Sequence, residues 1–296
     1  MSSVTLDVAS RRERPTISQR VLIWRAFRRH TLATAGLFTI LILVVIALLA
    51  PALAPYDPAE QDLMNSLMPP SREHLMGTDD LGRDTFSRVL VGSRVSLSVA
   101  FVSVAILITI GVLIGVVAGY YRTFDGPLMR VIDLMMSIPN TFLILTIVAL
   151  FGPGLRNTIL VIALTSWMGT ARIVRGQFLS LREKEFVEAA LAVGASNRRI
   201  IFRHIMPNIL SVVIVQATLF VAFTVIVEST LSYLGLGVQP PAPSWGNMLS
   251  SGRNFIQQAW WMTVFPGLAI FITVLAFNFL GDGLRDALDP RRTERR

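Results

Sequence analysis

The chain has 296 residues, of which 53% are hydrophobic and 16% charged, with a formal charge of +8 and a mean hydropathy of +0.59. Soluble domains are about a quarter charged, so this composition predicts a protein that crosses a membrane several times. The absence of cysteine excludes disulfides and thiolate chemistry. The three histidines are far apart in sequence, so we expect neither a metal site nor a cofactor. The arginines flank apolar runs, which is typical of membrane topology and argues against nucleic-acid binding.

The first 30 residues are basic, and we expect them to form a cytoplasmic tail. Residues 21–30 mix Trp24 and Phe27 with arginines, as in a helix that lies in the membrane interface. Topogenic charges beside the first span would give the same pattern. Residues 31–50 form an apolar run of about 20 residues, long enough for a first transmembrane helix. A cleaved signal peptide has a shorter apolar region, so we expect this span to be retained.

Residues 51–93 carry more acidic than basic side chains and are expected to lie outside the membrane. Within them, Asp84 and Arg88 are spaced to pair on one helix face. The core of the protein is predicted to be residues 94–282, in which apolar runs indicate five further helices. These runs cover residues 95–120, 128–151, 155–174, 209–234 and 260–280. The predicted fold is therefore all-α with six transmembrane helices.

The distribution of arginines predicts which segments lie on the cytoplasmic side of the membrane. The N-terminal tail, the loop at 176–207 and the tail at 283–296 are all rich in arginine. Six spans place these three segments on the same side, and the positive-inside rule makes that side the cytoplasm. Both termini are therefore predicted to be cytoplasmic.

Three features inside the spans have local consequences. Gly111, Gly115 and Gly119 recur every four residues and form a stripe for close helix contact, with a helix of this chain or of a partner. Pro139 lies inside the predicted third span and is expected to bend it. Arg130 and Asp133 lie three residues apart in the same span, where they could pair with each other.

Glu228 is an acidic residue within an apolar run, where a carboxylate must be paired, solvated or protonated. We consider two interpretations: a residue that lines a passage near the outer mouth, and a structural acid, either buried where it joins helices or solvated close to the membrane interface. Gln239 precedes a stiff proline-rich segment that ends at Trp245. We expect Gln239 and Trp245 to lie in an outer vestibule near that passage.

The most informative segment lies between the fourth and fifth predicted spans. Good helix formers from Glu185 to Val193 predict a short helix that stops at Gly194. A second basic helix follows, and Pro207 begins the next apolar run. The pattern resembles the cytoplasmic EAA loop of bacterial ABC-importer permeases, matching at Glu188, Ala189, Ala190, Gly194 and Pro207. The resemblance implies a coupling helix seated in an ATPase subunit, with docking residues Glu188, Ala189, Ala190, Gly194, Ala195, Arg198, Arg199 and Pro207.

Three other segments extend the resemblance over nearly the whole chain. Residues 74–88, 232–246 and 259–290 are similar to signatures of C-type subunits in dipeptide and oligopeptide permeases. The fold implied is that of a type I ABC importer permease in the bacterial inner membrane. The implied partners are a homologous B-type permease, two ATP-binding subunits that hold ATP and Mg, an extracytoplasmic binding protein and membrane lipid. The chain has no Walker A pattern, so it should not hydrolyse ATP itself.

Several alternatives remain open at this stage. The same machine could import nickel, glutathione or antimicrobial peptides, because selectivity belongs largely to the binding protein. A self-contained secondary transporter would need paired charges or broken helices at the midplane, and Glu228 is the strongest candidate for such a group. A membrane scaffold that recruits an ATPase without transporting anything is the third alternative.

Overall fold

The computed structural model describes residues 19–288, and helices joined by loops make up this part of the chain. Most of the predicted cytoplasmic N-terminal tail (residues 1–18) and of the predicted C-terminal tail (residues 289–296) lies outside the described residues. Apart from one isolated β-bridge between Thr78 and Asp84, the regular elements are α1 (Gln19–Arg29), α2 (Thr31–Leu53), η1 (Leu63–Asn65), α3 (Thr85–Tyr120), α4 (Arg122–Met136), α5 (Asn140–Phe151), α6 (Leu155–Arg182), α7 (Glu185–Ala192), α8 (Asn197–Arg199), η2 (Ile200–Ile205), α9 (Met206–Tyr233), α10 (Trp245–Gly252), η3 (Arg253–Phe255) and α11 (Trp261–Leu288).

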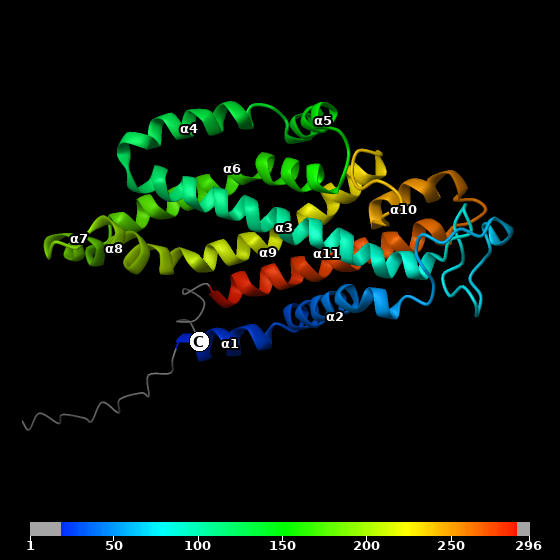
Figure 1. Cartoon of the computed structure of the whole chain (residues 1–296). Coiled ribbons are helices and arrows are strands. Elements are labelled where there is room, and N and C mark those ends of the chain that lie inside the picture. Colours follow the sequence, from blue (N-terminus) through cyan, green and yellow to red (C-terminus); the bar gives the residue numbers. More distant parts are fainter. Residues whose placement is uncertain (1–18, 289–296) are drawn as a thin grey trace, which may run out of the picture.

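The long helix α3 runs through the bundle beside α6, α9 and α2, and α11 packs between α9 and α2 (Figure 1). The glycine stripe on α3 faces α6, so its partner is within this chain. A Cβ added to Gly115 would lie 2.7 Å from the Ala171 carbonyl oxygen. A Cβ added to Gly119 would lie 2.5 Å from Phe178 Cβ. Only glycine allows the two helices to approach this closely.

Within residues 19–288, five helices are long and apolar enough to cross a membrane: α2, α3, α6, α9 and α11, with α9 continuous with α8 and η2. The third predicted span, residues 128–151, is instead a bent pair. Helices α4 and α5 meet at 84° across residues 137–139, which gives six spans if the pair counts as one. Proline has no amide hydrogen to donate, and Pro139 lies at this break as the N-cap of α5. The bend expected from Pro139 is confirmed, and it divides the third predicted span into two helices.

Helix α3 begins ten residues before the predicted apolar run because its polar first turns are buried. Asp84 caps the helix by accepting a hydrogen bond from the Ser87 amide at 2.7 Å. Asp84 also contacts His74 Nδ1 at 3.0 Å. The predicted pairing of Asp84 with Arg88 is wrong: the Arg88 Nε lies 3.4 Å from Asp79, and its Nη1 donates to the Pro58 carbonyl at 2.8 Å. Residues 54–84, between α2 and α3, are called the outer segment below, and they fold onto the start of α3.

The Arg-rich segments lie towards one end of the bundle. Helix α1, the C-terminal end of α11 and the α7–α8 loop are at the left in Figure 1, while the acidic segment before α3 and α10 are at the right. Phe27 of α1 is buried against Ala33 of α2 and Ala287 of α11. The residues expected to form an interfacial or topogenic segment are thus helical from Gln19 and anchored to the last span.

Candidate functional site

Of the loop predicted at 176–207, residues 176–182 continue α6, and residues 183–205 form a helical hairpin beyond its end. Helix α7 ends at Ala192, and Gly194 has φ +77°, the left-handed conformation that glycine adopts without strain. The Ala195 amide donates to the Ala190 carbonyl at 3.0 Å and the Gly194 amide to the Leu191 carbonyl at 2.9 Å. These bonds satisfy carbonyl groups at the helix end. The predicted stop at Gly194 therefore has a conformational cause.

One face of the hairpin packs against the bundle, and the opposite face is exposed. Val187 and Ala190 are buried against Phe178 of α6 and the isoleucines of η2. Glu188, Ala189 and Gly194 are exposed on the opposite face. Small side chains at these positions leave room for a close approach by another surface. Ala190, expected to offer such clearance, instead holds α7 against the bundle.

Large apolar side chains surround the small residues on the exposed face. Val193 is 84% exposed, Leu191 50% and Phe186 44%. They lie at one end of the molecule, away from the middle of the spans (Figure 1). Apolar side chains clustered at a bundle end mark an interaction surface. This surface, consisting of α7 and residues 193–194, is called the docking face below.

Hydrogen bonds join the base of the hairpin to α3 and α6. The Tyr120 hydroxyl contacts Asn197 Oδ1 at 2.9 Å, and Arg182 donates to the Tyr120 carbonyl at 3.1 Å. Arg198 and Arg199 are exposed, Ala195 is half-buried and Pro207 is exposed in the first turn of α9. Helices α8 and α9 join through η2, a π-helical stretch, so Asn197–Tyr233 is one continuous helix. The docking face is therefore joined to α9 through α8 and η2.

Glu228 lies near the other end of α9 and is fully buried. The Ser96 hydroxyl donates to Oε2 at 3.1 Å and the Ser232 hydroxyl to Oε1 at 2.8 Å. Ser96 belongs to α3, so the carboxyl joins two helices. Of the two interpretations of Glu228, this geometry matches the buried acid that joins helices, not a side chain on an open passage.

Trp245 extends this network to α10. Its backbone amide donates to Ser96 Oγ at 3.2 Å, and its indole Nε1 donates to the Val89 carbonyl at 3.1 Å. The Trp245 side chain is 1% exposed, so it anchors the outer end of the bundle. Gln239 is exposed, and its amide donates to the carbonyls of Gly235 and Gly237. Glu228, Ser96, Ser232 and Trp245 together form what we call the outer node.

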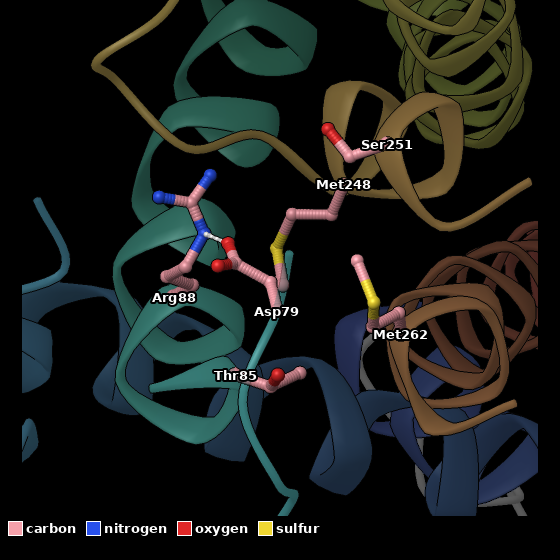
Figure 2. Close-up of a pocket in the computed structure, with 6 residues that line it drawn as sticks. All are labelled: Asp79, Thr85, Arg88, Met248, Ser251 and Met262. Carbon is pink, nitrogen blue, oxygen red and sulfur yellow. Dashed lines mark ion pairs between the residues drawn. The ribbon is translucent and has the colours of Figure 1, made fainter. Parts of the chain in front are cut away.

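Beside the outer node, charged side chains are buried between the outer segment and three helices. Asp79 accepts a hydrogen bond from Arg83 Nε at 2.7 Å. Figure 2 shows Asp79 and Arg88 facing each other, with Met248 of α10 and Met262 of α11 on the opposite wall. The void that they enclose measures about 10 Å³, room for about one water molecule. This cluster fixes the outer segment onto the bundle.

Two ion pairs that the sequence pattern did not indicate fasten α4 to α6. Asp133 pairs with Arg172, and Asp125 pairs with Arg175, whose Nη2 lies 2.8 Å from Oδ2. The predicted pairing of Asp133 with Arg130 is wrong, because Asp133 faces the neighbouring helix. Among residues 19–288, no group of three acidic or histidine side chains is arranged to hold a metal ion.

Comparison with known protein families shows to which family the chain belongs. Residues 108–294 match the family described as binding-protein-dependent transport system inner membrane component. The chain belongs to this permease family. Residues 18–70 also match the N-terminal transmembrane domain of oligopeptide transport permease C. The two matches cover the N-terminal span and most of the core, including the docking face and the outer-node residues Glu228, Ser232 and Trp245.

Curated relatives align with the permease over most of its length. The dipeptide transport system permease protein DppC of Alkalihalophilus pseudofirmus is 45% identical, with 90% of this chain and 88% of the relative covered. The DppC protein of Bacillus subtilis is 43% identical over 94% and 88%. The glutathione transport system permease protein GsiD of Escherichia coli is 46% identical over 90% and 89%.

A solved structure has the same fold. A chain of the MetNI methionine ABC transporter, determined in inward facing conformations, superposes with a TM-score of 0.55 at 19% identity. The match covers 68% of the permease and 96% of that chain. The expected fold, that of a type I ABC importer permease, is therefore confirmed.

Proposed function

We propose that the permease is one of two membrane subunits of an ATP-driven ABC importer that carries dipeptides and oligopeptides by alternating access. The observation that carries the proposal is the identity of 43–45% to dipeptide permeases over most of both chains. The residues of the docking face and, except for Ser96, those of the outer node lie within the aligned family. A permease moves solute without making bonds, so none of its residues is assigned a catalytic role.

The proposed assembly contains a homologous B-type permease, two ATP-binding subunits and an extracytoplasmic substrate-binding protein. ATP and Mg would be held by the ATP-binding subunits. The docking face is suited to such a partner because it combines small residues at Ala189 and Gly194 with the exposed side chains of Leu191 and Val193. We place it on the cytoplasmic side of the bacterial inner membrane, together with both termini, because arginines gather at this end.

The continuous helix from Asn197 to Tyr233 suggests how ATP binding is communicated across the membrane. Its 37 residues correspond to about 55 Å at the helical rise. The docking face lies against one end, and the outer node forms around Glu228 near the other end. Movement of α7 by the ATPase subunits would therefore tilt or shift this continuous helix, whose far end belongs to the outer node. In this mechanism, the movement opens the passage to the outside when ATP binds, and the passage opens to the inside again after hydrolysis.

Glutathione is the second candidate substrate. The observation that favours it is the 46% identity to a glutathione permease. Glutathione is itself a small peptide, so it would use the same passage. Uptake of labelled glutathione beside labelled alanine peptides by the purified complex distinguishes the two candidates.

Substitution of Glu188 tests the docking assignment. Glu188→Arg reverses an exposed charge on the docking face, and we expect the tagged permease to retain at least about tenfold less ATP-binding subunit on purification. The matched control is Glu60→Arg, the same change at an exposed residue of the outer segment, which should retain the wild-type amount. Wild-type retention by Glu188→Arg would overturn the assignment. Peptide uptake by the permease alone, without ATP, would overturn the ABC mechanism.

A further inference from the structure

An open cavity of about 270 Å³ lies where α4 and α5 meet, against α6 and α9. Methionine and aromatic side chains form much of its wall: Met135, Met136, Met168, Phe220 and Phe223. Its volume is near the lower end of ordinary small-molecule sites. None of its lining residues is charged.

The cavity lies near the middle of the membrane. Ser166 is on the wall at about the centre of α6 (Leu155–Arg182), and Phe220 is at the centre of α9 (Met206–Tyr233). Both helices are long enough to cross the membrane. The break between α4 and α5 at Pro139 borders the same space. Irregular backbone at this depth is tolerated where it is covered by protein or faces water, not where it faces lipid.

Two polar atoms at the cavity lack hydrogen-bond partners within the described part of the chain. They are Asn140 Oδ1 and Ser166 Oγ, and both atoms are shielded from solvent. A lipid acyl chain could not satisfy them, and leaving them unpaired in hydrocarbon is costly. A change of side-chain rotamer would bring either oxygen to the cavity, where water or the amide groups of a peptide would satisfy it. The two side chains therefore favour a polar occupant over lipid.

We propose that this cavity is a transient peptide-binding site halfway along the passage. Asn140 and Ser166 hydrogen-bond the peptide backbone, while the methionines and Phe220 contact its side chains. Methionine is flexible and polarizable, so such a wall adapts to side chains of different shape. Hydrogen bonds to the backbone, which all peptides share, give weak sequence selectivity. The inference rests on the proposed function, because it assigns the substrate of that function to a place in this chain.

Gly169 allows the cavity to be filled without disturbing the packing. It lies on the cavity wall, and a Cβ added there meets nothing within 4 Å. Gly169→Leu therefore extends a side chain into open space. Gly176, two turns further along α6, is equally open but does not line the cavity. Gly176→Leu is the matched control, with the same added volume on the same helix.

The test uses the complete importer in proteoliposomes, with its binding protein and ATP. The probes are radiolabelled dialanine and tetraalanine. We expect Gly169→Leu to lower tetraalanine uptake about tenfold or more and dialanine uptake less, while Gly176→Leu transports both like wild type. Assembly and ATP hydrolysis stimulated by the binding protein should remain in both variants. Wild-type uptake of both peptides by Gly169→Leu would overturn the inference and leave the proposed function intact. Failure of the wild-type complex to take up either peptide would overturn the peptide function and, with it, this inference.

Thiol labelling provides a second measurement, because the chain has no cysteine of its own. A charged methanethiosulfonate reagent enters water-filled space but not lipid. We expect it to modify Ser166→Cys in the working complex, and saturating tetraalanine should slow the reaction. Phe142→Cys, on α5 but outside the cavity wall, is the control and should react slowly and independently of peptide. A Ser166→Cys variant that never reacts, or that reacts equally with and without peptide, would overturn the proposal.

Discussion

Gly115 provides the sharpest test of how α3 and α6 pack. A Cβ at this position would lie 2.7 Å from both the Ala171 carbonyl oxygen and Val174 Cβ, whereas ordinary contact begins at 3.4 Å. A carbonyl oxygen and a β-branched carbon cannot rotate out of the way, so the helices must separate. Overpacking of this kind costs about 1–3 kcal/mol. The better helix propensity of alanine returns up to about 1 kcal/mol.

The assay compares Gly115→Ala with Gly169→Ala, where a Cβ meets nothing within 4 Å. Both variants gain the same helix propensity, so their difference isolates the cost of overpacking. We expect the free energy of unfolding of Gly115→Ala to be lower than that of Gly169→Ala by about 1–3 kcal/mol. The full chain in detergent is unfolded by heat or denaturant and followed by the fluorescence of its five tryptophans. If Gly115→Ala unfolds together with Gly169→Ala or after it, the close approach of α3 and α6 is refuted.

Two further predictions concern polar contacts. Glu228→Leu removes the acceptor for the hydroxyls of Ser96 and Ser232. The free energy of unfolding should fall by about 1–3 kcal/mol for each hydroxyl left unpaired, as measured by denaturant unfolding. A variant as stable as wild type would show that these hydrogen bonds do not stabilise the outer node. Asp125→Arg should weaken the contact between α4 and α6 by no more than about 1 kcal/mol, because this pair is partly exposed. Adding Arg175→Asp should restore the loss, and a double-mutant cycle with no coupling energy would argue against the pair.

The sequence predicted the features that are encoded locally. Apolar runs indicated the positions of the spans, and Gly194 indicated where α7 ends because its backbone conformation favours glycine. The start of α3 was missed because Ser87 and Arg88 are polar, and hydropathy cannot distinguish an exposed loop from a polar helix covered by another segment. The Asp84 cap was a signal for this start that could have been used.

Features that depend on distant residues were not predictable in the same way. Glu228 was recognisable as an acid within an apolar run, but its partner Ser96 lies 132 residues earlier in the chain. Asp133 pairs with Arg172 because α4 folds back along α6, and spacing within α4 contains no trace of that contact. Pro139 indicated a bend, but the angle is set by how α4 and α5 each pack on the bundle.

The π-helical turn in η2, between α8 and α9, determines how the hairpin responds to insertions and deletions. A π turn holds one residue more than an α turn, so it accommodates that residue without changing the direction in which the flanking helices face. Removing one residue from Ile200–Ile205 would convert it to a regular α turn and leave α7 facing the same way. One residue added within the regular part of α9 would instead rotate the hairpin relative to the bundle by about 100°, and Val187 and Ala190 would leave their buried contacts. The orientation of the docking face therefore depends on where a residue is gained or lost as well as on how many.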